Sequence, residues 1–182
     1  MGERDALSCR LRGTMRYPES EELCSHVKDL IGERIDRFMR VVVWIEGERV
    51  ELLDSLLVHS KGAGSPRTLQ LFADAHRQWS KWLVSRDDYT IEGEYEDRER
   101  EELQAVGDEL VPVIPEQAYS VWETGTDSGR EYLIGILFVA DGKVGPAVNV
   151  HLDDIDVMSA DAFWRYVGRV LPQTRAIEVR RI

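Results

Sequence analysis

The fold is decided by residues 131–153, EYLIGILFVADGKVGPAVNVHLD. Leu133 to Val139 is a continuous apolar run bounded by turn residues and too short to span a membrane, which is typical of a strand buried on both faces. Asp141 and Gly142 fit the two positive-φ positions of a type I′ turn, so the chain should fold straight back into a second strand over Val144 to Leu152. We therefore expect a central hairpin over residues 132–152.

The return strand has one apolar and one polar face, because strand side chains alternate. Val148 and Val150 fall on the first face, and Asn149 falls on the second. Carboxylates and a neutral imidazole can hold a divalent cation, so the polar face and the residues after it form a candidate metal site. Its members are His151, Asp153, Asp154 and Asp156. The alternative is that these residues only form turns and a helix cap, because their spacing matches no known metal site.

The rest of the chain predicts an α+β fold with a largely antiparallel, or alternatively mixed, sheet of about six to seven strands and about four helices packed on it. We expect helices from Pro18 towards Phe38, from Pro66 to about Val84, from about Glu94 to Gly107, and from an N-cap at Ser159 to just before Pro172. Apart from the hairpin, the predicted strands cover residues 41–45, 50–58, 89–95, 118–123 and 176–182.

Residues 1–17 are charged and lack a periodic pattern, which indicates a flexible or partly docked N-terminal arm. Residues 18–182 can then form a single α+β domain. The alternative is two pseudo-repeated halves, 18–95 and 96–182, because a Val-Trp pair precedes a glycine in both.

The charge balance favours some partners over others. Lys and Arg number 23 against 34 Asp and Glu, which gives a formal net charge of -11. Such a surface repels phosphate backbones and anionic lipids, so we expect no direct nucleic-acid binding and no membrane binding. A basic protein or a metal ion is the more favourable partner. The two cysteines are far apart and no hydrophobic leader is present, which indicates reduced thiols and a cytoplasmic location.

The most acidic stretch is residues 94–102, EYEDREREE. Opposed charges accelerate the encounter of two proteins, and exposed aromatic residues anchor interfaces. We therefore predict a partner-binding surface that consists of Glu92, Glu94, Glu96, Asp97, Glu99 and Trp82. The alternative is that the acidic run is the solvated face of a helix.

No motif for a catalytic nucleophile or a phosphate-binding loop is present, which favours a non-enzymatic protein without a cofactor. The leading hypothesis is a small acidic binding protein that acts on a basic partner, as small bacterial inhibitors and immunity proteins do. One alternative is a divalent-metal-binding enzyme centred on residues 151–156. Another is a structural or assembly subunit that forms homo-oligomers through a sheet edge.

Overall fold

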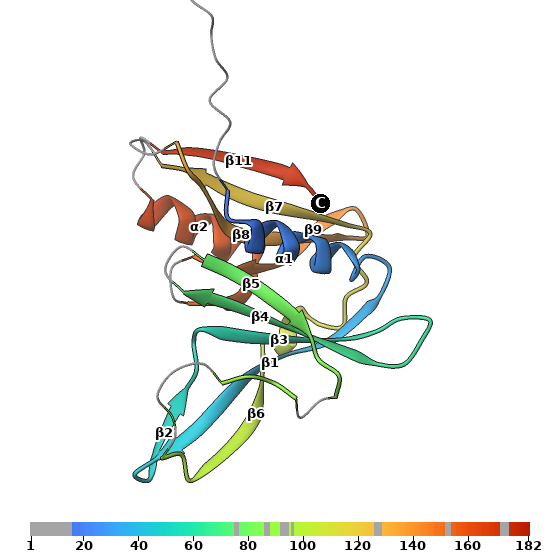
Figure 1. The fold of residues 1–182 in the computed structure, drawn as a ribbon. Coiled ribbons are helices and arrows are strands. Elements are labelled where there is room, and N and C mark those ends of the chain that lie inside the picture. The colour runs from blue at the N-terminus through green and yellow to red at the C-terminus, as the bar shows by residue number, and fades with distance from the viewer. Residues whose placement is uncertain are drawn as a thin grey trace, which may run out of the picture.

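The computed structural model describes residues 16–74, 77–85, 88–91, 95, 97–125, 129–151, 154–171 and 175–182. These residues form two antiparallel sheets and two α-helices (Figure 1). The elements are α1 (Pro18–Lys28), β1 (Arg34–Ile45), β2 (Glu48–Glu51), β3 (Ser55–Lys61), β4 (Arg67–Asp74), β5 (Arg77–Trp82), β6 (Arg100–Val106), a 3-10 turn (Asp108–Leu110), β7 (Gln117–Thr124), β8 (Glu131–Ala140), β9 (Lys143–Asn149), β10 (Asp156–Ser159), α2 (Ala160–Val170) and β11 (Ala176–Arg181).

The first sheet is built on β1, the longest strand. Its order is β2-β1-β3-β4-β5, and β6 pairs with β1 as well. Phe38 pairs with Val58 of β3 and with Val106 of β6, so these two strands flank β1 on opposite sides. The edges of the sheet are therefore β6 on one side of β1 and, on the other side, the short strand β2 and the strand β5, on which α1 packs.

The second sheet has the order β10-β9-β8-β7-β11 and contains the predicted hairpin at its centre. Asp141 and Gly142 join β8 to β9 with φ angles of 51° and 67°, as a type I′ turn requires. The predicted last helix is also confirmed, since the Ser159 hydroxyl accepts a hydrogen bond from the Ala162 N–H at 3.2 Å and α2 follows directly.

Three hydrophobic clusters hold these layers together. The largest lies between the two sheets and includes Leu23, Val27 and Leu30 near or on α1, which runs between the sheets in Figure 1. The second covers the other face of the first sheet around Val41, and the third lies between the second sheet and Phe163 of α2. A Cβ on Gly135 would stand 2.4 Å from the Phe163 ring, so only glycine lets α2 approach β8 this closely.

The predicted α+β fold with about four helices is wrong, because the described residues are mostly β-strand with only two α-helices; the expected antiparallel pairing is confirmed. Where the sequence predicts a helix over residues 66–84, residues 67–74 and 77–82 form the antiparallel strands β4 and β5. The apparent helical stripe is misleading because Thr68 to Ala73 are all buried, which requires a strand covered on both faces. His76 of that stripe lies outside the described residues.

Two further predicted helices need correction. The helix predicted over residues 94–107 is replaced by β6, whose seven residues all pair with β1. Helix α1 ends at Lys28, and Ile35 and Phe38 belong to β1. In each case pairing with a distant strand overrides the local helical pattern. The predicted strand over residues 89–95 is also wrong, as its described part is irregular chain that packs on the Val41 cluster.

The predicted N-terminal arm lies outside the described residues except for Arg16 and Tyr17. The division into halves at residue 95 stays a prediction, although β6 joins the first sheet from beyond it. Neither of the described helices combines the length and the hydrophobicity that a bilayer crossing requires.

Candidate functional site

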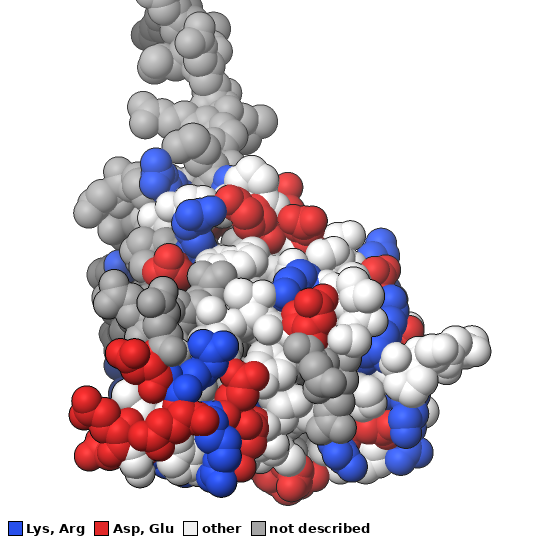
Figure 2. Space-filling model, turned by 60° about the horizontal axis from the view of Figure 1, so that its bottom comes forward, with Lys and Arg blue, Asp and Glu red and all other residues white. Residues whose placement is uncertain are grey.

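Exposed carboxylates gather where β1 ends and where β2 and β6 begin. Glu46 and Gly47 form the β1–β2 turn, and the Glu99 N–H donates to the Trp44 carbonyl at 2.8 Å, which places the start of β6 beside this turn. Figure 2 shows the carboxylates grouped at the lower left of that face of the molecule. We call this region the acidic end and define it by its exposed carboxylates: Glu46, Glu48, Asp97, Glu99, Glu101 and Glu102.

Basic residues neutralise only part of the acidic end. Arg98 pairs with Glu101 at 2.8 Å, while Arg49 pairs with the half-buried Glu51 at 2.7 Å. Arg100 lies over the Trp44 ring at 3.9 Å from its centroid, which covers an otherwise exposed aromatic face. Among the described residues, the other five carboxylates of the acidic end have no ion-pair partner. The acidic end therefore keeps an excess of negative charge facing solvent.

The structure brings together part of the predicted partner-binding surface. Asp97 and Glu99 lie exposed at the acidic end, whereas Glu92, Glu94 and Glu96 lie outside the described residues. Trp82 lies on β5, at the opposite edge of the first sheet, where Arg67 covers its ring at 3.8 Å. It packs against the main core and does not belong to the acidic end.

Sequence reasoning did not select four residues of the acidic end: Glu46, Glu48, Glu101 and Glu102. The β1–β2 turn at Glu46-Gly47 brings the first two beside the end of β1. The missing information was that β6 pairs with β1 across about 60 residues of chain, which no local pattern indicates.

A cavity of about 740 Å³ opens between α2, β10 and the β2–β3 turn. Its wall combines hydrogen-bond donors and acceptors with apolar side chains: Arg40, Leu53, Asn149, Asp154, Ile155, Asp156, Met158, Ala162, Arg165, Tyr166 and Arg169. Asn149 is 3% exposed and Arg40 is 7% exposed. Asn149 Oδ1 and Arg40 Nε are buried without a hydrogen-bond partner among the described residues, an arrangement that is rare in folded proteins.

Two of the predicted metal ligands lie at this cavity. Asp154 and Asp156 line it together with Asn149, and Asp156 pairs with Arg40 at 3.2 Å. His151 does not line the cavity but lies behind its wall, with its Nδ1 3.1 Å from the hydroxyl of the wall residue Tyr166. Its Nε2 is 3.9 Å from Glu123, which also pairs with Arg175. Asp153 lies outside the described residues, and within the described ranges no three or more His, Cys, Asp or Glu side chains form a group that could hold a metal ion.

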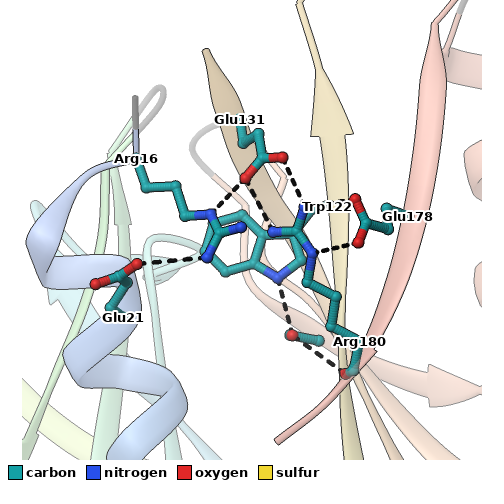
Figure 3. A network of polar contacts seen from close by, with 7 residues as sticks. Arg16, Glu21, Trp122, Glu131, Glu178 and Arg180 are labelled. Carbon is teal, nitrogen blue, oxygen red and sulfur yellow. Dashed lines mark hydrogen bonds and ion pairs between the residues drawn. The ribbon is translucent and has the colours of Figure 1, made fainter. Parts of the chain in front are cut away.

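A third group of charged residues joins α1 to the second sheet (Figure 3). Glu131, 4% exposed, accepts hydrogen bonds from Arg180 at 2.6 and 2.9 Å and also from Arg16. Both guanidinium groups lie within 6 Å of the Trp122 ring, at 5.6 and 5.2 Å from its centroid. The hydrogen bonds from Arg180 lower the pKa of Glu131 to about 2, against the opposing effect of burial, and Arg16 adds to the shift.

These charges are matched with one another, unlike those of the acidic end. Arg180 pairs with Glu178 of its own strand at 2.5 Å, and its ion pair with Glu131 links β11 to β8 across β7. We assign this network a structural role. Cys24, on the neighbouring α1, is a free thiol, and burial raises its pKa to about 12, which makes it a poor nucleophile.

Searches of protein-family models, of curated proteins and of solved structures found no match to this chain.

Proposed function

We propose that this chain is a non-enzymatic binding protein that engages a basic protein through its acidic end. The observation that supports this proposal is the set of five exposed carboxylates there without a described ion-pair partner, in a chain whose formal net charge is -11. The arginines described in this region leave these five carboxylates unpaired, because Arg98 pairs with Glu101, Arg49 pairs with Glu51 and Arg100 stacks on Trp44. At the acidic end these carboxylates cluster at the edge of a rigid sheet, where they can meet a partner as one surface.

The rigidity of this surface also supports the proposal. Residues 100–106 of β6 are held by pairing with β1, and Glu99 by its backbone hydrogen bond to Trp44. A partner would therefore not need to order a loop before binding. Electrostatic steering of this kind raises association rates by about 10- to 1,000-fold, and ionic strength suppresses it.

The test is capture of binding proteins from a lysate of the native host at about 20 mM and 500 mM salt, where screening lengths differ severalfold. Three baits are compared: the wild type, Glu99→Lys with Glu102→Lys, and Glu109→Lys with Glu116→Lys. The last variant changes the net charge equally, at exposed positions away from the acidic end. We expect a basic protein that the wild type and the control variant retain at low salt only, and that the acidic-end variant fails to retain.

Retention that is equal for both variants, or that survives high salt, would contradict the proposal. With the expected outcome, the chain would resemble in function an inhibitor or immunity-type protein, a class that acts by occupying a basic enzyme. We place this activity in the cytoplasm, which the free thiol of Cys24 supports.

A second candidate function is the binding of a small polar molecule in the cavity beside α2. The unpartnered Asn149 Oδ1 and Arg40 Nε favour it, because a ligand or water that reached them would relieve the cost of leaving them buried without a partner. The three arginines at the wall suit an anionic group, and Asp154 suits a cationic group or a metal ion held together with such a ligand.

Melting curves in the presence of inorganic phosphate, or of Mg²⁺, Mn²⁺, Ca²⁺ or Zn²⁺, test this second candidate. We expect a concentration-dependent rise in Tm with at least one of these probes, because a ligand that binds only the folded state stabilises it. The rise should be lost in Asp154→Asn and Arg165→Gln together and kept in His151→Ala, whose side chain faces Tyr166 and Glu123. An unchanged Tm with all five probes would exclude a site for simple ions in this cavity.

A further inference from the structure

Strand β11 forms one edge of the second sheet. The Ile182 N–H donates to the Ala118 carbonyl of β7 at 2.9 Å, so even-numbered residues of this strand direct their backbone groups at β7. Because these directions alternate along a strand, the backbone groups of Ile177, Val179 and Arg181 point to the open side. An open edge of this kind is a template for a further strand.

The other described edges are protected against such pairing. Helix α1 packs on β5, and β6 presents Glu101 and Glu102 to solvent. Strands β2 and β10 have only four residues each, and β10 continues directly into α2. In β11, by contrast, Ile177 is 36% exposed and Val179 is 46% exposed, and both side chains lie on the same face.

The sequence of β11, AIEVRR, is complementary to itself in one antiparallel register. With Val179 opposite Val179 of a second copy, each Glu178 stands opposite Arg180 of the other chain. These two positions are the non-hydrogen-bonded pairs, where cross-strand side chains approach most closely. A shift of the two-fold axis to Glu178 would oppose two glutamates, and a shift to Arg180 would oppose two arginines, so both alternatives are electrostatically unfavourable.

We propose that β11 pairs antiparallel with β11 of a second copy of the chain, with Val179 on the two-fold axis, so that two five-stranded sheets become one. The pairing would bury the exposed Ile177 and Val179 side chains beside each other at the junction. Glu178 would gain a partner across the interface while Arg180 keeps its bonds to Glu131. This surface lies on the other sheet from the acidic end, so dimerisation and partner binding can fail independently.

Single-cysteine cross-linking tests the register. In a Cys9→Ser, Cys24→Ser background, Val179→Cys should form a disulfide-linked dimer under mild oxidation, because the paired Cα atoms would be about 5.5 Å apart. Ile177→Cys is the matched control: it is similarly exposed on the same face, but its two copies would be about 14 Å apart along the strands. We expect cross-linking at least tenfold faster for Val179→Cys. Equal rates, or no dimer from either variant, would overturn the proposal.

Sedimentation equilibrium provides a test that does not depend on the cysteine variants. The wild type should show a concentration-dependent dimer that Glu178→Lys weakens roughly tenfold, because two attractive cross-strand pairs become repulsive. Glu109→Lys makes the same charge change away from β11 and should leave the dimer intact. A wild type that stays monomeric at millimolar concentration, or equal effects of the two substitutions, would contradict the pairing.

Discussion

Two edge strands among the described residues, β6 and β11, present opposite kinds of edge. Strand β6 and the neighbouring turn carry carboxylates that mostly lack an ion-pair partner in the described part of the chain, so two copies of this edge repel each other and attract a basic surface. Strand β11 carries charges of both signs around Val179, and its Arg180 is already paired with Glu131. The same residue types, glutamate and arginine, can therefore favour a different protein at one edge and a second copy of the chain at the other.

The largest effect on stability should come from removing the carboxylate that links β11 to the rest of its sheet. Glu131→Gln leaves Arg16 and Arg180 without their shared carboxylate, and we expect the free energy of unfolding to fall by about 3 kcal/mol, as for other buried pairs that lose one member. Urea denaturation measures this change in the free energy of unfolding. The control is Glu178→Gln, an exposed partner of the same arginine, which should cost much less; equal losses would show that Glu131 is no anchor.

The pH dependence of stability gives the next largest effect. Because the folded-state pKa of Glu131 is about 2 against an ordinary value of 4.5, its contribution is fully present above pH 4.5 and is lost as the pH falls towards 2. The shift corresponds to at most about 3 kcal/mol. The difference in unfolding free energy between wild type and Glu131→Gln should therefore shrink over this window, and a constant difference would refute the assigned pKa.

The sheet could be predicted from the sequence only where local and long-range signals agree. At the β8–β9 hairpin the Asp141-Gly142 turn joins two strands that are neighbours in sequence, and at α2 the Ser159 cap coincides with the apolar stripe. At β6 the glutamate-rich sequence favours a helix, yet β1 needs a second neighbour, and that requirement is invisible in residues 94–107. Long-range pairing outweighs intrinsic propensity there.

The candidate sites were likewise predictable only where their residues lie close together in the sequence. Asn149, Asp154 and Asp156 lie close in sequence and converge on one cavity. Strand alternation instead groups Asn149 with His151, which does not line that cavity. Arg40 reaches that cavity from 116 positions away from Asp156. The buried Arg40 and the arginines of α2 therefore change the site from a predicted metal centre into one that also suits an anion.

A substitution at the acidic end, at Arg100, should have a smaller effect on stability. Arg100→Ala removes the guanidinium group that covers Trp44, and we expect a loss of about 1 kcal/mol together with greater solvent access to the indole. Chemical denaturation and acrylamide quenching of tryptophan fluorescence measure the two changes. An unchanged stability would mean that the stack contributes nothing and that Arg100 is available to a partner.

The smallest effect on stability should come from the acidic end itself. Glu99→Lys with Glu102→Lys alters exposed side chains that have no described ion-pair partner, so the unfolding free energy should change by less than about 0.5 kcal/mol. Thermal and urea denaturation check this. A large loss of unfolding free energy would mean that these carboxylates have a structural role. Failure of this variant to retain a protein could then reflect unfolding and not a lost binding surface.

A crossed capture experiment tests most directly the claim that the two edges serve different partners. Tagged bait is mixed at low salt with native-host lysate and an untagged copy of the chain, and retention of that copy and of basic host proteins is measured. We predict that the Glu99→Lys, Glu102→Lys bait loses the basic protein and keeps the untagged copy. The Glu178→Lys bait should lose the untagged copy and keep the basic protein. If both variants retain both ligands, or each loses both, the distinction between the two edges is contradicted.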